Sequence, residues 1–111
     1  MTKSRMLLLS EYDITQKIIE ALSNVCSRAI LFSVRDKAKD VGSIAAELGI
    51  SLSAVYTTLR RLEDLALVEK RYDLNGKTKI MVYRSRISRA EILMDGEEPE
   101  LRLISSAGSG Q

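Results

Sequence analysis

Apolar side chains recur every three to four residues in the first part of the chain, which is the spacing of a helix with one buried face. The first such run is Ile14, Ile18, Leu22 and Val25. Asp13 precedes this run, and Gln16 follows three residues after Asp13, which is the spacing of a capping box. We therefore expect the first helix to begin near Asp13.

The same spacing predicts three further helices, each preceded by a residue that can cap its N-terminus. Ser23 or Asn24 is expected to cap the second helix, and Asp40 a short third helix from Val41 to Leu48. Gly49 is expected to end that helix in the left-handed conformation, and Ser51 to cap the fourth helix. The side chains expected to face inward are Ala29, Ile30, Leu31, Val34, Ile44, Ala45, Leu48, Val55, Leu59, Leu62 and Leu65.

The pattern changes period after Leu67, where β-branched and aromatic residues predict strands. Two such runs flank Asn75 and Gly76, a dipeptide that strongly favours a two-residue hairpin loop. A loop at these two residues would pair Leu74 with Lys77 and Tyr72 with Lys79. A second hairpin is predicted by alternation at Ala90, Ile92, Met94, Leu101 and Leu103, around a turn at residues 95–99.

These elements predict one α+β domain, mainly helical, over residues 1–104, with a flexible tail at residues 105–111. A chain of 111 residues can bury one core, but it is too short for a catalytic domain beside a regulatory one. With 45% hydrophobic and 29% charged residues, the composition excludes a fully disordered chain.

The most informative stretch is IAAELGISLSAVYTTLRRL, residues 44–62, which has the spacing of a helix-turn-helix. Ala45 supplies a small residue where two steeply crossing helices touch. Gly49 supplies the left-handed position that the short turn needs, and Val55 anchors the second helix on the first. A hairpin follows directly, which favours a winged helix-turn-helix.

These residues resemble the ArsR-type winged helix-turn-helix transcriptional regulators, and especially their small archaeal members. The resemblance covers about residues 13–86, and its segments are SRAILFSV, VGSIAAELGISLSAVYTTLRRLEDLALV, KRYDLNGKTKI and VYRS. It implies a homodimer that binds double-stranded DNA, with the second helix of the motif in the major groove and the wing along the backbone or in the minor groove.

The sequence departs from the family pattern in three ways. The metal-sensing members carry a Cys-x-Cys pair near the recognition helix, whereas Ser51–Leu62 contains no cysteine, so metal sensing through that site is excluded. The family usually has glycine between this helix and the wing, whereas this chain has Ala66. An alanine in the left-handed region costs about 1 kcal/mol, so we expect another geometry there. A C-terminal hairpin also replaces the long last helix with which many members dimerise.

The residues predicted to contact DNA lie on the fourth helix, opposite its apolar stripe, and on the first hairpin. Hydroxyl groups suit phosphate and base-edge contacts, Ala54 can meet a thymine methyl, and Arg60 is the best candidate for guanine or phosphate. The full set is Ser51, Ser53, Ala54, Tyr56, Thr57, Thr58, Arg60, Arg61, Lys70, Arg71, Lys77 and Lys79.

Other interpretations of these residues stay open. The polar helix face can be an ordinary solvated surface, and the hairpin lysines can protect a strand edge from aggregation. A winged helix can also serve as a protein–protein interaction module in a transcription or assembly complex. The net charge of only +2 is compatible with that alternative.

Dimerisation is predicted through the first helix and the apolar run before it. The candidate interface residues are Leu8, Ile14, Ile18, Ile19 and Leu22. The alternative is that they pack on the core of their own chain. The second hairpin can extend the wing sheet or pair across the dimer.

Composition excludes several other functions. The chain has no histidine and one cysteine, so we expect no His-ligated zinc and no Ser-His-Asp or Cys-His catalysis. We expect no catalytic residues, no metal and no cofactor, and the sequence identifies no effector. Met6–Leu9 is an apolar run too short for a signal peptide or membrane span, so we expect a cytoplasmic, chromosome-associated protein.

The charge is divided unevenly along the chain. Residues 1–86 carry 15 of the 17 basic and 10 of the 15 acidic side chains, a net charge of +5, and residues 87–111 carry a net charge of −3. The basic part is expected to face a polyanion.

Overall fold

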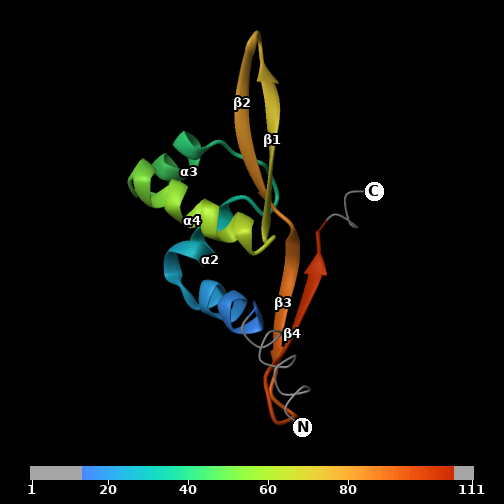
Figure 1. Ribbon diagram of the computed structural model, residues 1–111. Helices are drawn as coiled ribbons and strands as arrows, with labels where there is room; N and C mark the ends of the chain where they lie inside the picture. Colours follow the sequence, from blue (N-terminus) through green and yellow to red (C-terminus); the bar gives the residue numbers. More distant parts are fainter. Residues whose placement is uncertain (1–13, 107–111) are drawn as a thin grey trace.

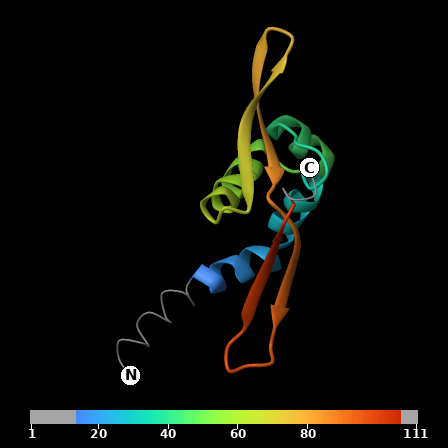
Figure 2. The ribbon, with the colours of Figure 1, turned by 90° about the vertical axis from the view of Figure 1, so that its right-hand side faces the viewer.

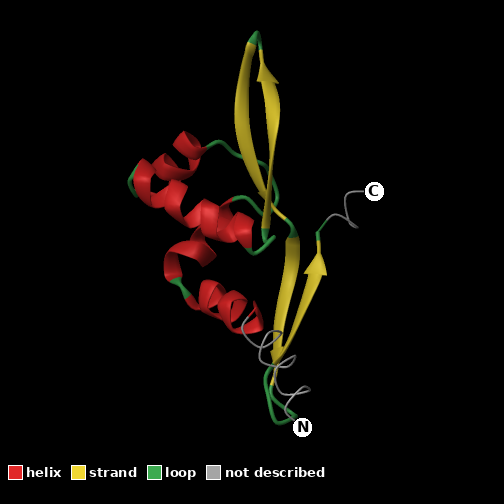
Figure 3. Cartoon of the chain, viewed as in Figure 1, coloured by secondary structure: helices red, strands yellow, loops and turns green. Residues whose placement is uncertain are grey.

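The computed structural model describes residues 14–106 and contains the predicted order of four helices and two hairpins (Figures 1 and 3). A helix covers residues 14–23. The elements that follow are α2 (Val25–Ser33), α3 (Val41–Leu48), α4 (Leu52–Asp64), β1 (Val68–Asn75), β2 (Thr78–Ser85), β3 (Ile87–Leu93) and β4 (Glu100–Ser105). The predicted α+β winged-helix class is confirmed.

The two hairpins form separate two-stranded antiparallel sheets and point in opposite directions (Figures 1 and 2). The helices gather beside the point where the sheets meet, with α3 and α4 near the β1–β2 hairpin, hereafter the wing. This arrangement makes the molecule long and narrow, with extents of 58 × 33 × 23 Å.

The core lies among α2, α3, α4 and the base of the wing. Its most deeply buried apolar side chains are Ile30, Val34, Ile44, Val55, Leu59, Leu62 and Leu67. Each contributes about 1.5–3 kcal/mol of hydrophobic stabilisation when fully buried. Since α4 provides three of them, its inner face is fixed and its outer face is left to solvent.

Two helices, α2 and α4, begin at capping residues that the sequence predicted. The side chain of Asn24 accepts a hydrogen bond of 3.0 Å from the amide of Ser27, which decides between Ser23 and Asn24. Ser51 caps α4 in the same way, since its hydroxyl accepts from the amide of Ala54 at 3.1 Å.

Asp40 stands at the N-cap of α3 but makes no such bond. Its carboxylate accepts from the Ser43 hydroxyl instead, which lowers the pKa of Asp40. The predicted cap at Asp13 lies outside the described residues.

The apolar stripe of the first helix differs from the prediction. Ile18 and Ala21 are buried, whereas Ile14 is 57% exposed and Val25 is 72% exposed. Val25 is exposed because the helix ends at residue 23 and Val25 already begins α2. Ile14 lies one turn before Ile18 and does not reach the core.

The wing has a different register from the predicted one. Leu74 pairs with Lys79 and Tyr72 pairs with Met81, so the predicted pairs are wrong and the loop consists of Gly76 and Lys77. Gly76 has a φ of +70°, and a type II′ turn takes glycine at this first loop position. The shift is an even number of residues, so each side chain stays on the predicted face of the sheet.

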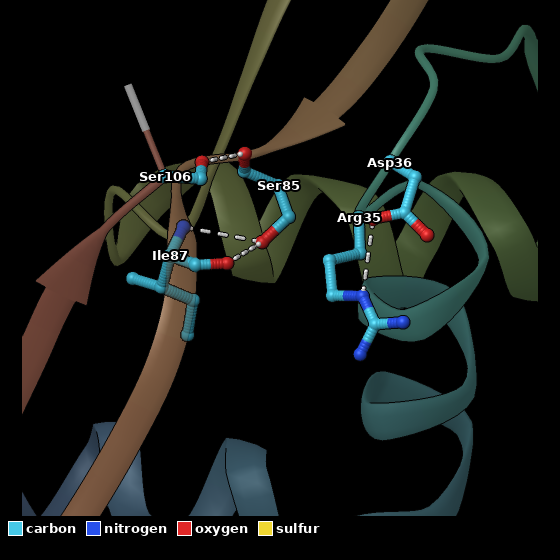
Figure 4. Close-up of polar contacts among 5 residues, drawn as sticks. All are labelled: Arg35, Asp36, Ser85, Ile87 and Ser106. Carbon is cyan, nitrogen blue, oxygen red and sulfur yellow. Dashed lines mark hydrogen bonds and ion pairs between the residues drawn. The ribbon is translucent and has the colours of Figure 1, made fainter. Parts of the chain in front are cut away.

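The second hairpin reaches further toward the C-terminus than predicted. Its register pairs Ala90 with Leu103 and Ile92 with Leu101, as the alternation indicated. Ser105 belongs to β4, and Ser106 is buried and donates from its hydroxyl to the carbonyl of Ser85 at 2.9 Å (Figure 4). The prediction that a tail begins at residue 105 is therefore wrong; residues 107–111 lie outside the described part of the chain.

The junction between α4 and the wing contains an alanine in the left-handed region. Ala66 has a φ of 61°, so the expectation of another geometry is wrong. The amide of Leu67 donates to the carbonyl of Leu62 at 2.8 Å, and the Leu67 side chain is fully buried. The sharp turn at Ala66 is thus maintained by the burial of the next residue.

We predict that Ala66→Gly raises the free energy of unfolding by about 1 kcal/mol, because glycine takes this φ without the steric cost of a Cβ. The measurement is reversible denaturant unfolding. Ala46→Gly, at an exposed position inside α3, is the matched control and should lower the free energy of unfolding by about 1 kcal/mol. Two changes of the same sign would contradict the assignment of strain to Ala66.

Candidate nucleic-acid interface

The turn between α3 and α4 has the geometry of a helix-turn-helix. Gly49 is left-handed, with a φ of 68°, and its amide donates to the carbonyl of Ala45 at 2.8 Å. Ala45 is 8% exposed where the two helices meet, and Val55 is completely buried on the facing side. The positions predicted to be small, left-handed and apolar therefore serve those roles.

The outer face of α4 carries both polar and apolar side chains. Ser53, Thr57 and Arg60 are exposed, and Tyr56 is 58% exposed. Leu52, one turn before Tyr56, is 53% exposed at the start of the helix. The N-terminus of a helix favours negative charge, so its first turn is suited to a phosphate.

A cleft of about 410 Å³ separates this face of α4 from the base of the wing. It is lined by Tyr56, Thr57, Arg60, Glu63, Lys70 and Tyr83. Lys70 and Glu63 form an ion pair of 3.4 Å that joins β1 to α4. Burial raises the pKa of Tyr83, so its hydroxyl stays protonated and can donate a hydrogen bond.

One face of the wing continues this cleft. Because side chains alternate along a strand, the cross-strand register puts Lys70, Tyr72 and Lys79 on the same face. The ammonium of Lys79 lies 5.7 Å from the centre of the Tyr72 ring, a cation–π distance. Arg71 is exposed on the opposite face, and Lys77 is exposed in the loop.

Lys39 holds the wing against the helices. Its backbone pairs with that of Tyr83 through two hydrogen bonds of 3.0 and 2.8 Å. Its ammonium donates to Glu47 on α3 at 2.6 Å, and Ser33 at the end of α2 donates to the same carboxylate at 3.0 Å. The hydrogen bond from Lys39, with the smaller contribution of Ser33, lowers the pKa of Glu47.

The same region of the chain matches known regulators. A family model described as bacterial regulatory protein, arsR family, matches residues 28–70, which run from within α2 to the start of β1. An uncharacterized HTH-type transcriptional regulator of Methanocaldococcus jannaschii is 37% identical over 70 residues, which cover 63% of this chain and 74% of that protein. The chain belongs to the ArsR family of transcriptional regulators.

The fold of this ArsR-family chain is shared with a solved structure. NolR from Sinorhizobium fredii is 28% identical and superposes with a TM-score of 0.62, over 71% of this chain and 75% of NolR. These findings confirm the resemblance noted in the sequence. The chain is a transcriptional regulator whose helix-turn-helix is of the DNA-binding kind, and its family consists of regulators, not enzymes.

In this ArsR-family chain most of the predicted contact residues lie where they can meet one partner. Ser53, Tyr56, Thr57 and Arg60 share the outer face of α4, and Lys70 lies across the cleft. Three other predicted contact residues are either less accessible to a partner or lie away from the cleft. Ser51 is exposed but its hydroxyl caps α4, Ala54 is half-buried, and Arg71 is on the other face of the wing.

Two predicted contact residues do not join this face. Thr58 is 8% exposed, and its hydroxyl lies 3.5 Å from the sulfur of Cys26, so its placement on the exposed face is corrected. Arg61 is exposed but lines a different cleft, which it shares with Lys17 and Glu20 of the first helix. The cause is helical geometry, since Arg61 is about 100° around the axis from Arg60.

The residues predicted to form the dimer interface differ in their exposure. Ile18 is buried in the core of its own chain, which corrects its assignment to an interface. Ile19 and Leu22 are half-buried, and Ile14 remains exposed. Leu8 lies outside the described residues.

Three residues on the outer face of α4 or at the cleft were not among the predicted contacts. Leu52 is four residues before Tyr56, so the helical period alone puts it on the same face. Glu63 and Tyr83 line the cleft. Glu63 is three residues after Arg60 on α4, so the helical period also puts it on this face, whereas Tyr83 belongs to β2 and only the fold brings it to the cleft.

Within residues 14–106, no group of three or more Cys, Asp or Glu side chains is arranged to hold a metal ion. In the same residues, none of the helices combines the length and apolarity needed to cross a membrane.

We predict that Glu47→Gln slightly lowers the unfolding temperature at neutral pH and reduces its fall in acid. The pKa of Glu47 is lowered in the folded state, so its contribution is complete above the pKa of an unfolded glutamate and disappears as the pH falls through the lowered value. The effect is small because the ion pair is partly exposed.

The measurement is thermal unfolding by circular dichroism from neutral to strongly acidic buffer. Glu98→Gln, the same change at an exposed turn, is the control and should follow the wild-type curve. Parallel curves for Glu47→Gln and the wild type would show that the Lys39–Glu47 contact does not stabilise the fold.

Proposed function

We propose that this regulator binds specific double-stranded DNA sequences as a homodimer, with α4 in the major groove and the wing on the backbone. The observation that carries the proposal is the convergence of the outer face of α4 and one face of the wing on a single cleft. A groove edge and its adjacent phosphates could occupy these two surfaces at once.

The residues of α4 provide the sequence readout in this proposal. Arg60 is exposed and can donate two hydrogen bonds to a guanine edge. Ser53 and Thr57 supply hydroxyls for base edges or phosphates. Leu52, which is exposed at the start of the helix, supplies an apolar contact for a thymine methyl.

The wing provides affinity rather than specificity. Lys70, Lys77 and Lys79 are exposed cations, and each phosphate that they neutralise releases a counterion. Binding should therefore weaken as salt rises. A symmetric dimer would read two half-sites about one helical turn apart on the chromosome.

One observation favours a second candidate, a winged helix that contacts another protein. Tyr72 and Leu74 near the end of the wing are 64% and 70% exposed, and Tyr56 on α4 is also largely exposed. Apolar contacts of this kind are insensitive to salt, so a salt series separates the two functions.

We expect labelled duplex from the native upstream region to bind the full chain, with log K falling linearly against log salt. Lys77→Ala should reduce that slope by about one, because one phosphate contact is lost. Fluorescence anisotropy measures both quantities. Arg102→Ala, on the hairpin that points away from the wing, is the control and should leave the slope unchanged. Absence of binding even at low salt would favour the protein-interaction candidate.

We predict that Arg60→Ala weakens binding to the preferred site by about 1–3 kcal/mol and relaxes the preference at one base position. Competition with single-base variants of the site measures both effects. Arg61→Ala removes the same charge from the neighbouring position on the other side of α4 and should cost much less. An unchanged affinity for Arg60→Ala would mean that another face of α4 meets the DNA.

A further inference from the structure

A second groove, which runs from the base of the wing along β3, is apolar inside and basic at its rim. It occupies about 410 Å³ between the first helix, α2 and β3. Leu22, Phe32, Ile87 and Ile92 form much of its wall. Phe32 is 65% exposed and Ile92 is 45% exposed, so the groove leaves large apolar side chains in contact with water.

Three arginines line the rim of this groove, hereafter the basic groove. They are Arg28, Arg35 and Arg89, and none of the described lining residues is acidic. Arg89 pairs with Glu91 on the same strand at 2.7 Å, whereas the bonds of the other two arginines are long and exposed. Arg28 donates to the carbonyl of Leu22 at 3.4 Å, and Arg35 pairs with its exposed neighbour Asp36 at 3.4 Å (Figure 4). The rim can therefore accept an anionic partner at little cost.

The tip of the β3–β4 hairpin has the complementary character. Met94 is 73% exposed there, which is an unusual position for a large apolar side chain. Exposed Asp95, Glu97 and Glu98 follow it directly. One chain thus carries an apolar groove with a basic rim and an apolar tip with acidic neighbours.

The hairpin tip lies beyond the groove of its own chain and points away from it. β3 lines the groove from Ile87 to Ile92, and Met94 follows about 7 Å further along the chain. Because both strands of the hairpin are extended, the tip does not turn back into this groove. Two hairpins related by a two-fold axis would lie antiparallel, which brings each tip to the other chain's groove.

We propose that a second copy of this chain fills the basic groove: the acidic hairpin tip of each protomer inserts into the basic groove of its partner. The inference rests on the proposed homodimer and names its interface. Ala90, Ile92 and Leu103 are exposed on one face of the hairpin and would extend the apolar contact between the two chains. The hairpin points away from the wing, so this contact leaves α4 and the wing open to DNA (Figures 1 and 2).

The test exchanges the charges of the two surfaces in the full chain. A groove variant carries Arg28→Glu and Arg35→Glu, and a tip variant carries Glu97→Lys and Glu98→Lys. Sedimentation velocity gives the dimer Kd, and circular dichroism checks that each variant folds. Like charges at an interface oppose association, so each variant alone should raise the dimer Kd about tenfold or more.

Mixing the two variants should restore dimers, because each groove then meets a tip of opposite charge. A single chain with all four substitutions should also dimerise to within a few-fold of the wild type. Lys77→Glu with Lys79→Glu is the control, since it reverses two charges on the wing. It should leave the dimer intact and abolish DNA binding.

Three results would overturn the inference. They are a wild type that stays monomeric, variants that dimerise like the wild type, and variants whose mixture does not recover dimers. In the last case, the acidic tip is not what the basic groove binds. None of these results removes the DNA-binding role, which the anisotropy measurements with Arg60→Ala test separately.

Discussion

The two backbone hydrogen bonds between Lys39 and Tyr83 determine where the wing stands. A two-stranded hairpin is only marginally stable in water by itself, so a wing needs a further attachment to hold a direction. Lys39 supplies it as a one-residue third strand, and its ammonium ties the same point to Glu47 on α3. Together with the Lys70–Glu63 ion pair, that attachment keeps Arg60 and Lys70 facing one cleft.

Local signals in the sequence were enough for the helix-turn-helix. The left-handed Gly49 and the cap at Ser51 each depend on atoms within four residues, which a single sequence contains. For Thr58, the type of side chain led to a wrong prediction. Thr58 is three residues after Val55, a spacing that belongs to the buried stripe, yet its hydroxyl suggested an exposed contact. The helical spacing from Val55 predicted the burial of Thr58 better than its polar side chain did.

Contacts between distant segments were not predictable in the same way. Lys39 reads as part of a polar connection, and nothing in its neighbours indicates that it pairs with Tyr83. Ser105 and Ser106 were predicted to start a tail for the same reason, since Ser106 is fixed by a hydrogen bond to Ser85 of β2. The predicted register of the wing was wrong by two residues. Glycine suits either position of a two-residue loop, and the local sequence does not decide which of them Gly76 occupies.

The charge division along the sequence corresponds to a division in space. The basic side chains of the wing occupy one end of a 58 Å molecule, those of α4 lie beside the base of the wing, and the acidic turn after Met94 occupies the other end. An acidic turn beside the wing would repel the same phosphates that the lysines attract, and over a screening length of about 8 Å the repulsion would be felt. Hairpins that diverge from the junction near Ser85 remove that conflict. The opposite directions of the two hairpins therefore allow one small chain to present a surface for a polyanion at one end and an acidic surface for a basic partner at the other.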